Sequence, residues 1–203
     1  MRHCGRSVRP GIVRRTAGIW GPTIFCGAAV MAARRQSGYS HRSHHISGLA
    51  ARGERSARVM VPGYIALGLS SSVTAAPTET LRRLALAAGV ATVVAGLVPV
   101  SAPSCPQPFV DAEATATDVG HAIASITAFA LWTAMPITAF RQCTPGWFRS
   151  LSGALGMSTV AGFVAAGVTT NSQSPRKGLA QRAFVGAVVA WYGATAIAEL
   201  AEG

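Results

Sequence analysis

The sequence predicts an all-α, polytopic integral membrane protein, a bundle of about six transmembrane helices. Half of the 203 residues are hydrophobic and only 12% are charged, against roughly 25% in a typical soluble domain. Six long stretches of the chain also lack Asp, Glu, Lys and Arg. A hydrocarbon core of about 30 Å needs roughly 20 helical residues. Each stretch is therefore long enough, or nearly long enough, to cross a bilayer.

Three parts of the chain follow from these stretches. Residues 1–15 form a basic segment that is expected in the cytoplasm, residues 16–200 form the transmembrane domain, and residues 201–203 form a tail. The six helices are expected near 16–33, 59–76, 84–101, 119–140, 150–170 and 180–200.

Charges or prolines mark the ends of the first three expected helices. Arg34 and Arg35 follow the first apolar run, and its 18 residues exceed the roughly 7 to 15 of a signal-peptide core. That run is therefore a stop-transfer span. The second helix is expected to end before Pro77 and the third near Pro99, since the missing amide of proline costs least at a helix end.

The last three expected helices have similar boundaries. The fourth begins after Asp118 and is expected to bend at Pro136. The fifth ends before Pro175 and carries small residues at the spacing of close helix packing. The sixth charge-free run is the shortest, so it reaches span length only if Arg182 and Glu199 extend to the membrane interfaces.

The distribution of basic residues predicts cytoplasmic termini. With six spans, the 18 Lys and Arg residues divide equally between the two sides. The stretch 84–140 contains none of them, however, and its loop is acidic, so no positive charge opposes its translocation. This loop and the loops 34–58 and 171–182 are therefore expected outside the cell membrane.

The net charge of +11 does not indicate nucleic-acid binding. The basic residues stand in short clusters between apolar runs, without the interleaved aromatic residues that stack on bases. Such clusters anchor helix ends at lipid headgroups. The expected partner is the lipid bilayer, with lipid headgroups or another membrane protein as further candidates.

Three histidines, His41, His44 and His45, crowd the first outward loop. Together with His121 they offer the neutral imidazole ligands that zinc accepts. Zinc is thus an alternative cofactor, although the spacing does not match an established zinc motif and no cofactor is the primary expectation. In the competing interpretation the loop forms a short amphipathic helix on the headgroups. Its apolar face would consist of Ile46, Leu49 and Ala50.

A candidate outer polar site comprises Asp118, His121, Arg182 and Tyr39. Asp118 and His121 share a helix face at a spacing of three residues, and Arg182 begins the last span at the same membrane depth. A carboxylate and a guanidinium at one depth are expected to form an ion pair. The alternative is that Asp118 caps its own helix.

Four segments carry motifs of a recognisable kind: Gly21-Pro22-x-x-Phe25, the first loop SGYSHRSHHISGLAARGERSARVM, His121 with Phe129 and Trp132, and Gly178-Leu179-Ala180-Gln181-Arg182 with Trp191. They resemble an uncharacterised bacterial membrane family, domain of unknown function 998, which is common in actinobacteria. The resemblance covers most of the chain. It implies a six-helix membrane bundle and assigns no reaction, substrate or cofactor.

The leading functional hypothesis is a non-enzymatic binding or accessory membrane protein with an outward polar loop site. The sequence contains no nucleophile elbow, P-loop, dinucleotide fingerprint or HExxH motif. The alternatives are a small transporter and a metal-dependent intramembrane hydrolase that uses the His cluster.

Overall fold

The computed structural model describes residues 11–74, 76–101, 114–170 and 174–201, and the regular structure in these residues is entirely helical. The all-α prediction is thus confirmed. Most of the expected segments 1–15 and 201–203 lie outside the described residues. The helices are α1 (Ile12–Arg35), the 3-10 helix η1 (Ile46–Ala50), α2 (Ala57–Val73), α3 (Glu79–Leu97), α4 (Ala116–Gln142), α5 (Trp147–Thr170) and α6 (Lys177–Ala201).

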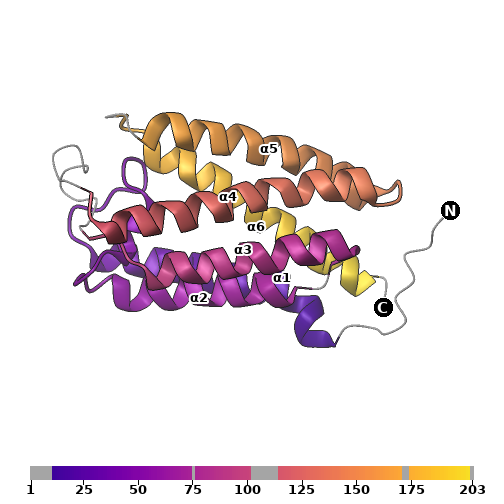
Figure 1. The fold of residues 1–203 in the computed structure, drawn as a ribbon, viewed down its shortest axis with the longest axis horizontal. Coiled ribbons are helices and arrows are strands. Elements are labelled where there is room, and N and C mark those ends of the chain that lie inside the picture. The colour runs from indigo at the N-terminus through magenta and orange to yellow at the C-terminus, as the bar shows by residue number, and fades with distance from the viewer. Residues whose placement is uncertain (1–10, 75, 102–113, 171–173, 202–203) are drawn as a thin grey trace.

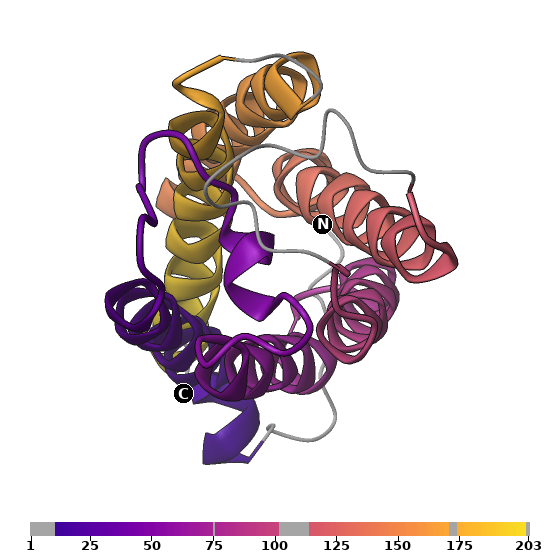
Figure 2. The same ribbon diagram turned by 90° about the vertical axis from the view of Figure 1, so that its left-hand side faces the viewer.

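The six α-helices run up and down beside one another and close into a ring (Figures 1 and 2). Each helix packs against the next one along the chain, and α6 returns to pack against α1. Helices α1, α3 and α5 end where α2, α4 and α6 begin. We call this the loop end of the bundle, and the opposite end, where α1 begins and α6 ends, the terminal end.

Five of the helices, all except α2, are long and apolar enough to cross a membrane. Helix α2 has 17 residues, a length of about 26 Å at 1.5 Å per residue, and it packs between α1 and α3. It ends at Val73, whereas the sequence predicted an end at residue 76.

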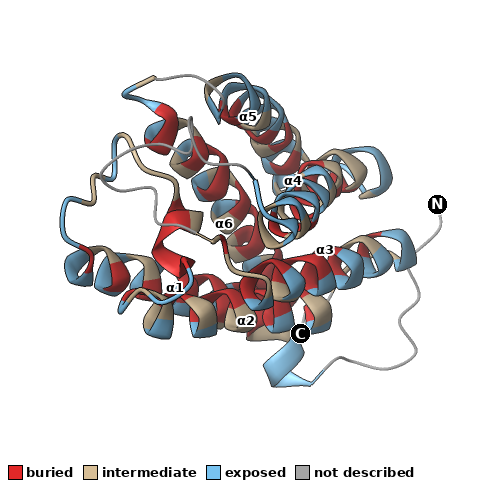
Figure 3. Ribbon diagram, turned by 60° about the vertical axis from the view of Figure 1, so that its left-hand side comes forward, coloured by how far each residue is buried: buried red, intermediate tan, exposed pale blue. Residues whose placement is uncertain are grey.

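Buried residues line the interior of the bundle and exposed residues its outward faces (Figure 3), and many of the exposed residues are large and apolar. Met157 is 76% exposed, Val168 72% and Ile123 62%. A water-soluble protein rarely exposes a continuous apolar surface of this kind. Lipid tails provide the environment that such a surface requires.

Helices α2 and α3 approach each other backbone to backbone at Gly68 and Gly89. A Cβ atom on Gly68 would lie 2.6 Å from the Gly89 carbonyl oxygen, and one on Gly89 would lie 2.4 Å from the Gly68 carbonyl oxygen. No side chain fits at either position without movement of a helix. Close van der Waals packing of this kind holds helices together in a bilayer, where hydrophobic burial contributes little.

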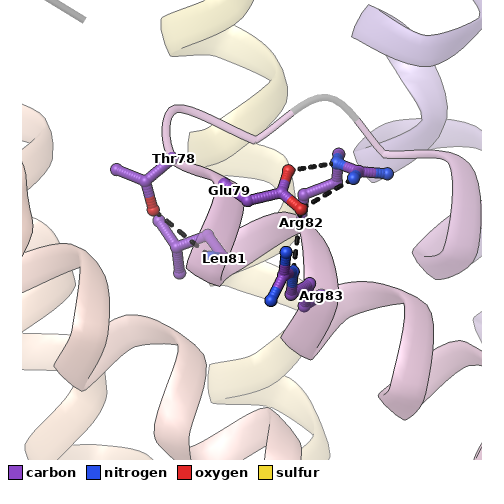
Figure 4. Close-up of polar contacts among 5 residues, drawn as sticks. All are labelled: Thr78, Glu79, Leu81, Arg82 and Arg83. Atoms are coloured by element: carbon purple, nitrogen blue, oxygen red, sulfur yellow. Dashed lines mark hydrogen bonds and ion pairs between the residues drawn. The ribbon is translucent and has the colours of Figure 1, made fainter.

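A polar first turn begins α3 five residues earlier than the sequence predicted (Figure 4). The Thr78 hydroxyl caps the helix by accepting a hydrogen bond from the Leu81 amide at 3.2 Å. The Glu79 carboxylate bonds Arg82 at 2.7 Å and Arg83 at 2.8 Å. The helix therefore extends beyond its charge-free core, with its charges paired at the terminal end.

The loop between α1 and α2 folds inward, and η1 occupies the centre of the ring at the loop end (Figures 2 and 3). Ile46 is only 4% exposed, and Leu49 and Ala50 are fully buried. The competing interpretation of this loop placed these residues in a short helix on the headgroups. A short helix is present, but its expected location on the headgroups is wrong, because its apolar residues are buried in the bundle. Their apolar side chains are buried inside the bundle, where η1 contacts α1, α2 and α6.

Candidate functional site at the loop end

Arg182 and Tyr39, two of the predicted site residues, are in direct contact. The Arg182 guanidinium donates hydrogen bonds to the Tyr39 hydroxyl and, at 2.9 Å each, to the carbonyl oxygens of His44 and Gly178. It also lies over the Tyr39 ring, 5.6 Å from the ring centre, a cation–π arrangement. The Tyr39 hydroxyl in turn donates to the His45 carbonyl oxygen at 3.2 Å. Arg182 therefore fastens the loop to α6.

The loop backbone follows the first turns of α6. The Leu179 amide donates to the Arg42 carbonyl oxygen at 3.1 Å, and the Ile46 amide donates to the buried Gln181 side-chain oxygen at 2.6 Å. A Cβ atom on Gly178 would lie 2.6 Å from the His44 carbonyl oxygen. A glycine is thus required at this position for the two segments to touch.

The loop histidines lie close to Tyr39. The ring centres of His41 and His44 are 5.4 and 5.6 Å from that of Tyr39, and the His45 carbonyl oxygen accepts a hydrogen bond from the Tyr39 hydroxyl. His44 accepts a hydrogen bond from the Ser40 amide at its Nδ1, 2.8 Å away, so this ring nitrogen carries no proton. Burial, followed by the positive charges of Lys177 and Arg182, lowers the pKa of His44. The same causes in the same order, with His44 as a further one, lower the pKa of His45 to about 4. Both imidazoles are therefore neutral at pH 7.

The structure does not bring the predicted zinc ligands together. Among the described residues, no group of three or more His, Cys, Asp or Glu side chains is placed to hold a metal ion. His121 lies in α4, is 4% exposed, and directs its Nδ1 to the carbonyl oxygens of Ala95 and Val98 at 2.9 Å each. Since both partners are acceptors, Nδ1 donates, and the ring ties α4 to the end of α3.

Asp118 is the third residue of α4 and completes a capping box whose N-cap is Thr115, and it does not form the predicted ion pair with Arg182. Its carboxylate accepts hydrogen bonds from the amide and hydroxyl of Ser101, at 2.8 and 2.6 Å, and from the amide and hydroxyl of Thr115, at 2.9 and 2.6 Å. Thr115 and Asp118 form a reciprocal capping box. These four donors satisfy the carboxylate, so the predicted pairing with Arg182 is wrong.

The predicted outer site therefore divides into two parts at the loop end. Tyr39 and Arg182 hold the loop on α6, whereas Asp118 and His121 join α3 to α4. The structure adds Gln181 and Lys177, which the sequence did not single out as site residues. No sequence signal marked Lys177, because the last helix was expected to begin at residue 180, whereas it begins at Lys177.

The class that these features define is a multi-pass helical membrane protein whose first extramembrane loop is folded into one end of the bundle. Residues 19–198 match the family described as Protein of unknown function (DUF998). The chain belongs to this family, as its sequence motifs suggested. No curated protein and no solved structure matches the chain significantly.

Proposed function

We propose that the chain is a non-enzymatic binding or accessory protein of the cell membrane. In this proposal the termini are cytoplasmic, and the loop end faces outward and forms the recognition surface. The orientation is supported by the stretch 84–140, which contains no Lys or Arg and so meets no positive-charge barrier to translocation.

The observation that carries the binding role is the way in which the loop is held. Residues 46–51 are buried except for Ser47, and hydrogen bonds from Arg182 and to Gln181 fix the loop on α6. The exposed side chains of His41 and Arg42 therefore stand on a preorganised surface. Preorganisation lowers the entropy cost of binding, whereas a loop that had to order on contact would bind more weakly.

Asp118 and His121 support a structural role better than a catalytic one. Four donors surround the Asp118 carboxylate, and His121 uses its Nδ1 to join two helices. A general base must instead be within hydrogen-bond reach of a substrate proton.

Native mass spectrometry of protein extracted in a mild detergent tests the proposal. The variant H41A/R42A alters the exposed surface of the loop, and R141A/T144A, also exposed, is the matched control at the terminal end. We expect a bound lipid, small molecule or membrane protein to be retained by the wild type and the control and lost from the loop variant. Equal retention by all three would contradict the proposal, as would stoichiometric zinc or solute flux in proteoliposomes.

A further inference from the structure

Lys177 is a buried cation at a position where the fold supplies positive charge. It is the first residue of α6 and is only 8% exposed. The amides of the first helical turn carry a partial positive charge, which favours an anion and disfavours a cation. The first turn of α6 contains no acidic residue, so the helix itself does not compensate the ammonium group.

The surroundings of Lys177 add to this charge. Its ammonium is close enough to His44 and His45 to disfavour their protonation, and Arg182 acts on the same two rings. Among the described residues, neither Lys177 nor Arg182 forms an ion pair with a carboxylate, since the ion pairs found there belong to Glu79. Lys177, a buried residue, and Arg182, a half-buried one, thus lie in one region of the loop end, and neither has a carboxylate to balance its charge among the described residues.

Free hydrogen-bond donors accompany the charge. Within the part of the chain that the structure describes, the Lys177 ammonium has no hydrogen-bond acceptor, and neither has the Gly178 amide, whereas the Leu179 and Ala180 amides are bonded. Arg182 differs from Lys177 because its guanidinium is already engaged by the loop carbonyls and Tyr39. Lys177 is therefore the cation that remains available to a ligand.

We propose that the N-terminal turn of α6, with Lys177 as its principal cation, binds the phosphate group of an anionic ligand at the loop end. A phosphate offers several acceptor oxygens to the ammonium and to a helix-terminal amide, the arrangement by which helix N-termini hold anions. This inference rests on the proposed binding function and names the chemistry of its ligand. The phosphate can come from a lipid headgroup, because Lys177 begins a candidate span, or from a soluble phosphate.

Thermal unfolding in a phosphate-free maltoside detergent tests the site. The variants are K177Q and, as matched control, R176Q, which removes the same charge from the adjacent exposed residue. Inorganic phosphate is titrated at constant ionic strength in one arm and short-chain phosphatidic acid in the other, with phosphatidylcholine as the lipid control. We expect saturable stabilisation of the wild type in at least one arm, an apparent Kd about tenfold weaker or more in K177Q, and little change in R176Q.

The arm that responds identifies the source of the phosphate. Without any added anion, K177Q is expected to unfold at the wild-type temperature or above, because removing the uncompensated charge relieves repulsion. A lower unfolding temperature of K177Q would overturn the proposal, since it would reveal a carboxylate partner within the chain. The absence of a response in both arms would also overturn it, as would equal weakening by K177Q and R176Q. Loop-dependent retention of a ligand without phosphate would refute this inference and leave the proposed function standing.

Discussion

At Arg182 a single guanidinium connects a loop and a helix that lie far apart in sequence. The Tyr39 hydroxyl is 143 positions away, and the His44 carbonyl oxygen 138. We expect Tyr39→Phe and Arg182→Gln each to lower the free energy of unfolding in detergent, by roughly 1.5 to 3 kcal/mol for lost hydrogen bonds to a charged group. The double variant should lose less than the sum of the two, because the residues share one contact. Thermal or denaturant unfolding measures all three variants.

Asp118→Asn combined with Arg182→Gln is the control for this cycle. The Asp118 partners are Ser101 and Thr115, so the two substitutions should be additive. Strong coupling between Asp118 and Arg182, with additivity between Tyr39 and Arg182, would contradict the arrangement described above.

His45 makes stability depend on pH. Burial comes first among the causes that hold its folded-state pKa at about 4, followed by the charges of Lys177, Arg182 and His44, whereas an unfolded histidine titrates near 6.5. Between these two values the unfolded chain binds a proton that the folded chain does not. Stability is therefore complete above about pH 6.5 and falls as the pH is lowered towards 4, by at most about 3 kcal/mol.

Unfolding temperatures measured from pH 7.5 to pH 5 test this expectation. His45→Gln should remove much of the decline, and His41→Gln, at an exposed position, should leave most of it in place. A wild-type protein that is equally stable at both pH values would show that His45 is not buried in its neutral form.

At the scale of the helices, the contact between α2 and α3 depends on two glycines. Gly68→Ala and Gly89→Ala would each place a methyl group against the backbone of the other helix, and overpacking of this kind costs about 1 to 3 kcal/mol or more. Gly186→Ala in α6 is the matched control, because a Cβ atom at Gly186 would have nothing within 4 Å of it. It should leave the unfolding temperature unchanged or raise it slightly. Equal effects at all three positions would show that the close contact is not limiting.

The helices could be predicted because lipid imposes a simple rule, a long run without charge. The predicted ends of the helices were less accurate than their predicted existence, for a physical reason. Glu79 and Arg82 lie in the helical first turn of α3, outside any charge-free run, because paired charges are compatible with helix at a membrane interface. Conversely, a helix can end inside a charge-free run: α2 ends at Val73 although the residues that follow are uncharged.

The loop end was only partly predictable. A capping role for Asp118 was among the alternatives that the sequence offered. Such a role depends on residues that are near in sequence, and Thr115 is only three positions away. The contact of Tyr39 with Arg182 depends on how the ring of helices closes. The sequence pattern around either residue does not predict that closure. For η1, the spacing of Ile46 and Leu49 indicates an apolar face correctly but does not distinguish lipid from the interior of the bundle.

At the scale of the whole molecule, we propose that the bundle crosses the membrane six times with its loop end outward. Five helices meet the length and hydropathy of a span, so the path of α2 decides whether the two termini share a side. The 17 residues of α2 lie between two candidate spans along its length, which favours a sixth crossing.

Reporter fusions test this claim most directly. A reporter that is active only outside the membrane is fused before Met1, fused after Gly203, or inserted near Phe109 between α3 and α4. Six crossings with the loop end outward predict silence at both termini and activity near Phe109. Activity at one terminus alone would show an odd number of crossings, and activity at both termini with silence near Phe109 would reverse the orientation.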